Sequence, residues 1–205
     1  MSWQSTHAGE WDEAGRVLEE AAAAVLQRAG AEAIVLCTNI MYSVLWGIAG
    51  ASNLPLLHIA GPTAERIVRA GFRVVGLLGT RFTMVQDFLL RDAPFGLAIV
   101  VPDEEGLGAV HDIIYKDLCN GIVQENSRDM YYRVVTGLQA AGAECLILDC
   151  TGIGLLLDGK EVEERCGLPL LTLPKFMRWL RQTGQWRLAT KTDGLVWTRQ
   201  RQKNA

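Results

Sequence analysis

The chain has no apolar run of about 18 residues or more, the length that a membrane-spanning helix needs. Its first ten residues, MSWQSTHAGE, are polar and lack the apolar core of a secretory signal. The five cysteines are odd in number and irregularly spaced, which favours reduced thiols over a disulfide framework. We therefore expect a cytoplasmic protein that does not bind membranes.

The usual signals for metal, nucleotide and nucleic-acid binding are absent as well. There are three histidines and no CxxC or HExxH motif, so no metal site is predicted. The segment 75–83, VGLLGTRFT, has neither the GxGxxG spacing of a dinucleotide site nor a P-loop, although its backbone N–H groups could bind a carboxylate or phosphate. The net charge of −3 argues against a nucleic-acid partner.

Short apolar segments alternate with helical stretches along most of the chain. This pattern is typical of an α/β fold in which helices cover a parallel sheet. Strands are expected at 33–36, 54–59, 73–78, 97–101, 145–149 and 168–173. The main helices are expected at 11–28, 63–70, 83–90, 103–120 and 127–141, the last capped by Ser127. Near the C-terminus, Asp193-Gly194 between two apolar runs predicts a β-hairpin appended to the α/β core.

Two of the expected strands end in a similar way. Ile34-Val-Leu is followed by Cys37-Thr38, and Ile147-Leu-Asp is followed by Cys150-Thr151. A thiol at the start of a helix lies near free backbone N–H groups, which can lower its pKa from about 8.5 towards neutrality. Such a pair could move a proton on and off one carbon. A buried structural role for each cysteine, or a redox pair of Cys37 with Cys150, are the alternatives.

Several segments, in this order, resemble the aspartate/glutamate racemase family, which belongs to a superfamily that includes hydantoin racemases, maleate isomerases and arylmalonate decarboxylases. The resemblance extends over about residues 8–171. The segments that carry it are Ile34–Asn39, Leu56–Ala60, Val75–Met84 with Gln86-Asp87-Phe88, Ile114-Tyr115 with Leu118-Cys119 and Gly121, and Gly142–Thr151. The opening Met1-Ser2-Trp3 also resembles the end of a motif near the family's N-terminus.

The resemblance implies two Rossmann-like half-domains with parallel sheets, related by a pseudo-twofold axis and often assembled as homodimers. In this chain, residues 1–57 with 168–205 would form the first half, and residues 58–167 the second. The implied reaction is racemisation of aspartate, glutamate or a broader set of amino acids. It needs neither pyridoxal phosphate nor metal, because one residue removes the α-proton and another returns a proton from the opposite face.

Carried onto this chain, the resemblance makes Cys150 the second base and Thr38 the first, with Cys37 as a competitor because an unaided hydroxyl is a poor base. Neighbours on an extended strand face opposite sides, so only one of Cys37 and Thr38 can face the cleft. The family's contacts to the substrate carboxylate correspond to Met1, Asn39, Ile40, Thr83 and Thr151.

The chain departs from the family pattern at several positions. Tyr42 replaces a histidine, and Gly152 replaces a glutamate that follows the second Cys-Thr pair. The family's first strand, helix and second strand have no counterpart, so the first half-domain is expected to be incomplete. These departures keep two alternatives open: a ligand-binding protein on a degenerate racemase scaffold, and a decarboxylase or cis–trans isomerase of small dicarboxylates.

Overall fold

The computed structural model describes residues 11–19, 25–36, 45–54, 56–57, 60–86, 96–172, 186–191 and 194–199. The chain divides into two compact units. The first unit is Met1–His58 with Leu180–Ala205, and the second unit is Ile59–Trp179. The strand Leu170–Thr172 pairs with its neighbour inside the second unit. That these units are the family's two half-domains stays a prediction.

The described part of the first unit contains short elements. These are α2 (Trp11–Glu19), β1 (Ile34–Val35), α3 (Leu45–Gly50), β2 (Leu56–Leu57), β7 (Trp186–Lys191) and β8 (Gly194–Arg199). The strands β1 and β2 are parallel, with Ile34 opposite Leu56. The antiparallel pair β7–β8 confirms the predicted hairpin, and its turn residues lie outside the described ranges.

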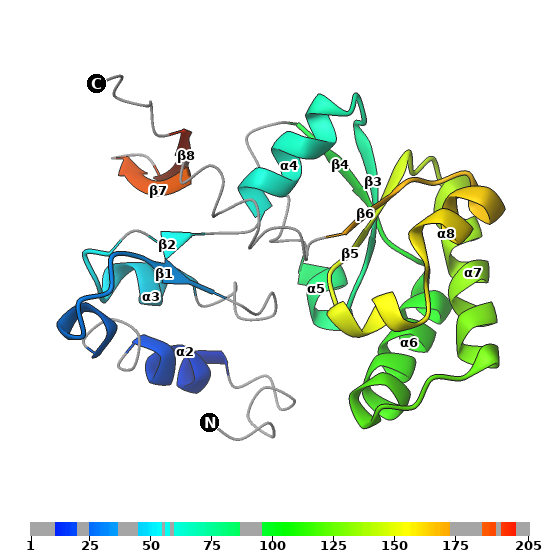
Figure 1. The fold of residues 1–205 in the computed structure, drawn as a ribbon, viewed down its shortest axis with the longest axis horizontal. Coiled ribbons are helices and arrows are strands. Elements are labelled where there is room, and N and C mark those ends of the chain that lie inside the picture. Colours follow the sequence, from blue (N-terminus) through cyan, green and yellow to red (C-terminus); the bar gives the residue numbers. More distant parts are fainter. Residues whose placement is uncertain are drawn as a thin grey trace. The chain divides into compact units, whose positions relative to one another are not determined.

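The second unit is built around one parallel sheet (Figure 1). Its strands are β3 (Val74–Leu78), β4 (Ala98–Val100), β5 (Cys145–Leu148) and β6 (Leu170–Thr172), in the order β4-β3-β5-β6. Its helices are α4 (Ala60–Arg69), α5 (Arg81–Gln86), α6 (Glu104–Asp112), α7 (Glu125–Ala140) and α8 (Gly159–Cys166). Figure 1 shows α4 on one face of the sheet and α6, α7 and α8 on the other. The predicted α/β fold with a parallel sheet is confirmed.

The two central strands are buried on both faces, which explains their unbroken apolar sequences. Leu77 and Leu78 of β3, and Leu146 and Ile147 of β5, have essentially no exposed surface. The helix α7 closes one face with Tyr131, Val135 and Leu138. The carboxyl ends of β3 and β5 are therefore fixed by a packed core.

Between α6 and α7 the chain does not form the single regular helix that the sequence predicts for 103–120. After α6 comes a π-helical turn, η3 (Ile113–Asp117), in which the N–H of Leu118 donates to the carbonyl of Ile113. A short 3₁₀ turn, η4 (Leu118–Asn120), follows and ends at Gly121, whose φ of 72° lies in the left-handed region. The π turn changes which side chains share a face just before the chain reverses.

The predicted cap at Ser127 is wrong. The helix α7 begins at Glu125 with Gln124 as its N-cap residue, and Ser127 lies inside the first turn. The Ser127 hydroxyl donates instead to Asp117 Oδ2 at 2.8 Å, which ties α7 to the π turn. Among the described residues, no helix is long and apolar enough to cross a membrane.

Candidate active site

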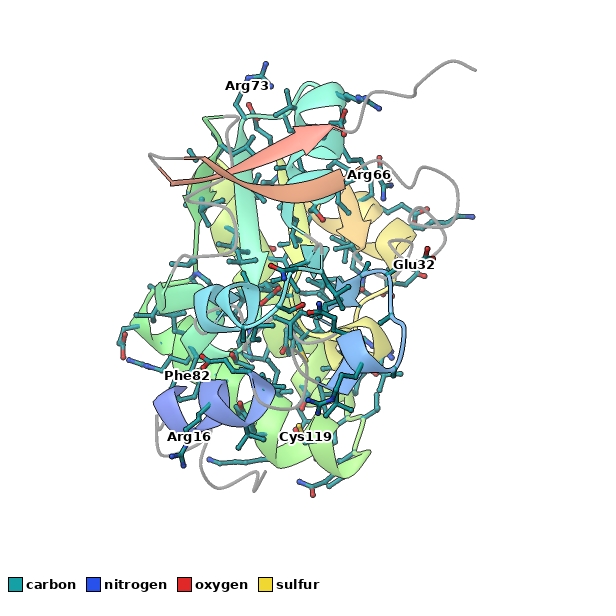
Figure 2. The ribbon with its side chains drawn as sticks, turned by 90° about the vertical axis from the view of Figure 1, so that its left-hand side faces the viewer. Arg16, Glu32, Arg66, Arg73, Phe82 and Cys119 are labelled. Carbon is teal, nitrogen blue, oxygen red and sulfur yellow. The ribbon has the colours of Figure 1, made fainter. Side chains whose placement is uncertain are left out.

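Two adjacent strands of the second unit end at a topological switch point. The chain leaves β3 towards β4 on one side and later returns to β5 on the other side of β3. Leu78 is paired with Leu148, so Gly79-Thr80 and Asp149-Cys150 follow neighbouring strands at the same carboxyl end of the sheet. In Figure 2, Arg73, just before β3, lies at the opposite end of the sheet from Phe82 and Cys119. In open α/β proteins, ligands bind beyond the carboxyl ends of the strands at such a switch point.

Cys150 leaves β5 in an extended conformation, with φ −134° and ψ 125°, and precedes the 3₁₀ turn η5 (Thr151–Leu155). Its side chain is half-buried at the border of the core. Burial raises the pKa of the Cys150 thiol above its usual value, although the backbone N–H groups of Gly152 and Ile153 act in the lowering direction. The charges of Cys119 and Asp149 add to the rise in pKa.

The expectation that the start of a helix lowers the pKa of this thiol is therefore wrong in its net direction. The backbone N–H groups are present, but the cost of burying a thiolate outweighs them. Cys150 consequently holds its proton at neutral pH. The two N–H groups stabilise the thiolate when the proton leaves.

The neighbouring end of β3 is closely packed. Thr83 is 1% exposed, and its hydroxyl donates to the carbonyl of Thr80 at 2.9 Å. A Cβ on Gly79 would lie 2.5 Å from Thr83 Oγ1 and 3.0 Å from Asp149 Cβ. Only glycine fits between these two side chains. The hydroxyl of Thr83, the backbone of Gly79 and the buried Asp149 thus form one packed cluster at the switch point.

Three of the predicted site residues lie in the described part of the second unit. Cys150 follows β5, the exposed Thr151 begins η5, and the buried Thr83 lies in α5 beside the end of β3. The other five, Thr38, Cys37, Asn39, Ile40 and Met1, lie outside the described residues. The assigned roles of all eight residues stay predictions.

A row of rings, which no sequence motif predicts, borders this end of the sheet. The His111 ring centroid is 4.6 Å from that of Tyr115 and 6.1 Å from that of Phe82. The Nδ1 atom of His111 accepts a hydrogen bond from the backbone N–H of Arg81 at 3.3 Å. His111, Tyr115 and Cys119 are spaced four residues apart on an expected helix, and that spacing could have identified a shared face.

Gly152 occupies the position where the resemblance implies a glutamate. A Cβ there would lie 3.4 Å from Leu118 Cβ and 3.7 Å from Cys150 Sγ, both ordinary contact distances. The glycine is therefore not required by close packing, in contrast to Gly79. A side chain at this position would begin in contact with the Cys150 thiol.

Residues 2–175 match the model of the Asp/Glu/hydantoin racemase family. The chain belongs to this family. It is 41% identical to a candidate Asp/Glu racemase from Yersinia pestis, a similarity that covers 83% of this chain and 73% of that one, with a TM-score of 0.73. It is 27% identical to an aspartate racemase homologue from Pyrococcus horikoshii, with 89% and 80% covered and a TM-score of 0.72.

A more distant likeness supports the fold alone. A glutamate racemase isoform from Bacillus anthracis is 16% identical over 85% of this chain and 66% of that one, with a TM-score of 0.60. The resemblance to the aspartate/glutamate racemases is thus confirmed at the level of family and fold. In this racemase-family chain, the switch point of the second unit carries Cys150 where the family's second base is expected.

Proposed function

We propose that the protein is a cofactor-independent amino-acid racemase that acts on aspartate, glutamate or a broader set of amino acids. The observation that carries the proposal is the half-buried Cys150, placed after β5 at a topological switch point in a chain of the racemase family. Its substrate would be a small molecule that carries an α-proton and a carboxylate. Homodimer formation and a cytoplasmic location stay predictions.

The raised pKa of Cys150 supports a starting role for this residue as the proton donor in the two-base reaction. Because its thiol is protonated at neutral pH, the resting site holds the transferable proton on this sulfur. A base on the opposite face, Thr38 or Cys37, would remove the α-proton while Cys150 donates its own proton. In the reverse direction the Cys150 thiolate, which the N–H groups of Gly152 and Ile153 stabilise, would act as the base.

Deuterium exchange tests this proposal directly. Incubation of the protein with L-aspartate or L-glutamate in heavy water should place deuterium at Cα, detected by NMR or mass spectrometry. The Cys150→Ala variant should lower the exchange rate by about a thousandfold or more, within the range for the loss of a general acid–base group. Cys166→Ser is a matched control, because that buried cysteine ends α8 and its thiol lies 3.7 Å from the Thr136 hydroxyl.

No exchange from either amino acid by the folded wild-type protein would count against the proposal. That outcome would favour a non-catalytic ligand-binding protein on the same scaffold, for which Gly152 in place of the expected glutamate is the supporting observation. A shift in melting temperature with aspartate or glutamate, without deuterium uptake, would identify this second function.

A further inference from the structure

A cavity of about 550 Å³ opens between the start of α6 and the side of α7, in the second unit. Both helices lie on the same face of the sheet (Figure 1). The volume is in the range of pockets that hold small molecules. The lining residues belong to the segment after β4, to α6 and to α7 with its C-cap residue, and none of them is among the predicted residues of the candidate active site. The proposed function therefore does not account for this cavity.

Close packing holds the α6 wall of the cavity in place. Asp103 is the N-cap residue of α6, and its side chain accepts a hydrogen bond from the backbone N–H of Gly106 at 2.9 Å. A Cβ on Gly106 would lie 2.8 Å from Pro102 Cβ and 3.5 Å from Val134 Cγ2, so only glycine fits between the segment after β4 and α7. This wall is preformed, and a ligand would not have to order it.

Gly137 forms part of the opposite wall, and close packing does not explain its presence. It lies in the interior of α7, where glycine is less stabilising than alanine. A Cβ at Gly137 would meet nothing within 4 Å, in contrast to Gly106. Since Gly137 also lines the cavity, the missing side chain leaves space there and lets a ligand approach the α7 backbone.

The cavity carries opposite charges on its two walls. Arg133 lies four residues before Gly137, so the two share one face of α7, and Glu105 lies in the first turn of α6. Within the part of the chain that the structure describes, Arg133 forms no ion pair, whereas Arg128 on the same helix is paired with Glu125. The Arg133 guanidinium is thus available to bind a carboxylate through two parallel hydrogen bonds.

The rest of the lining is mostly apolar. Val101 and Val134 are partly buried against the core, and Leu138 is 1% exposed. A ligand that fits these surfaces carries a carboxylate for Arg133, an ammonium group for the acidic wall and an apolar body. The carboxylates at the start of α6 disfavour a ligand with two negative charges, such as a dicarboxylate or a phosphate.

We propose that this cavity binds a free α-amino acid with a large apolar side chain. Arg133 binds the carboxylate of the ligand, Glu105 accepts hydrogen bonds from its ammonium group, and Gly137 leaves the space that its side chain fills. The inference is independent of the proposed function, because it uses none of the residues assigned to the reaction.

A titration with L-phenylalanine, followed by NMR of the backbone amide groups, tests this site. Saturable shifts of the glycine signals, Gly106 and Gly137 among them, should give a dissociation constant for the wild type. Gly137→Leu fills the cavity and should abolish the saturable shifts. Gly108→Leu is the matched control, because a Cβ at Gly108 in α6 also meets nothing within 4 Å and this residue does not line the cavity. Its dissociation constant should equal that of the wild type.

The charged contacts are tested by the same titration. Arg133→Gln should raise the dissociation constant about tenfold or more, as expected for the loss of a hydrogen-bonded charge pair. Arg69→Gln on α4 should stay within about twofold of wild type, because it removes only an exposed pair with Glu65. Phenylpropionate, which lacks the ammonium group, should bind more weakly than L-phenylalanine. Glu105→Gln should weaken the binding of L-phenylalanine more than that of phenylpropionate.

Circular dichroism establishes that each variant is folded, and the exposed Arg133→Gln keeps the test valid if Gly137→Leu fails to fold. No saturable shift in the wild type at millimolar L-phenylalanine would overturn the inference. So would equal binding by the wild type and either cavity variant, or equal binding of phenylpropionate and L-phenylalanine. Binding should survive in Cys150→Ala, and its loss there would place the ligand at the candidate active site and overturn the inference. Deuterium exchange at Cα tests the proposed function separately.

Discussion

The ends of β3 and β5 lie side by side and follow strands of the same apolar character, yet they are built differently. After β3, the side chain of Thr83 is buried against Gly79, and its hydroxyl is committed to Thr80. After β5, Cys150 remains half-buried and Thr151 is exposed. The first end is closed by packing, and the second keeps reactive atoms near the surface.

The contrast shows how a closely packed strand end can support a neighbouring strand end that carries a reactive side chain. The closed end of β3 packs against the side chain of Asp149, the residue directly before Cys150. The backbone that carries the thiol is thereby fixed from the neighbouring strand. The Cys150 side chain itself is half-buried and keeps part of its surface exposed.

Gly79→Ala should have the largest effect on this arrangement. The new Cβ would clash with Thr83 Oγ1 and Asp149 Cβ, so we expect a loss of about 2–3 kcal/mol in the free energy of unfolding, within the range for overpacked cores. Chemical denaturation measures it. Gly108→Ala is the control, because a Cβ at this position in α6 meets nothing within 4 Å and should stabilise the helix by up to about 1 kcal/mol. An unchanged free energy of unfolding in Gly79→Ala would show that the end of β3 can rearrange.

Thr83→Val should cost about 1–2 kcal/mol, because the isosteric side chain removes a buried hydroxyl and leaves the Thr80 carbonyl without that donor. Thr151→Val at the other strand end should change stability by less than about 0.5 kcal/mol, since that side chain is exposed. Thermal or urea unfolding compares the two. Equal effects would contradict the assignment of a closed and an open end, and the KM of both variants tests their predicted contacts with substrate.

The alkylation rate of Cys150 should continue to rise, about tenfold per pH unit, beyond the pH at which an unperturbed thiol with a pKa of about 8.5 levels off. Burial and the charge of Asp149 disfavour the thiolate, so the midpoint moves to higher pH. Asp149→Asn removes the like charge and should move the midpoint down. Both pH profiles are measured by quenching the alkylation at set times and quantifying the modified Cys150 peptide by mass spectrometry. A midpoint at or below that of a free cysteine peptide would refute the raised pKa.

Gly152→Ala should have the smallest effect, less than about 0.5 kcal/mol, because its Cβ would meet Leu118 and Cys150 at ordinary contact distances. Differential scanning calorimetry beside Gly79→Ala gives the comparison within one experiment. A loss above about 1 kcal/mol would mean that η5 cannot accept the side chain that the family pattern implies at this position.

The fold of the second unit could be predicted because its central strands are continuous apolar runs ended by glycine or a cysteine–threonine pair. Helix α8 was not predicted, since only Val162 and Cys166 of its eight residues are buried and the apolar period is weak. Its cap was the available signal: Asp158 accepts from the backbone N–H groups of Lys160 and Glu161. The predicted cap at Ser127 is wrong although serine suits that position, because the Ser127 hydroxyl donates to Asp117 instead.

The candidate site could be predicted where a sequence motif contains the reactive residue, and not where its properties depend on tertiary packing. Cys150 was found from its place after a strand and from the family resemblance. The direction of its pKa was not, because burial depends on the contacts of η4 with η5. The row from Phe82 to Tyr115 joins α5 and α6 through a backbone N–H and through edge and tilted ring contacts, which no local pattern specifies.

The π turn at Ile113–Asp117 makes this protein sensitive to chain length at a single point. An α-helix advances by about 100° per residue, so deleting one residue from the turn would rotate every side chain before it relative to those after it. Regular α-helical hydrogen bonding would then be restored locally. The orientation of His111 relative to Leu118, which lies beside Gly152 and Cys150, would change, so the length of this turn affects the packing next to the thiol.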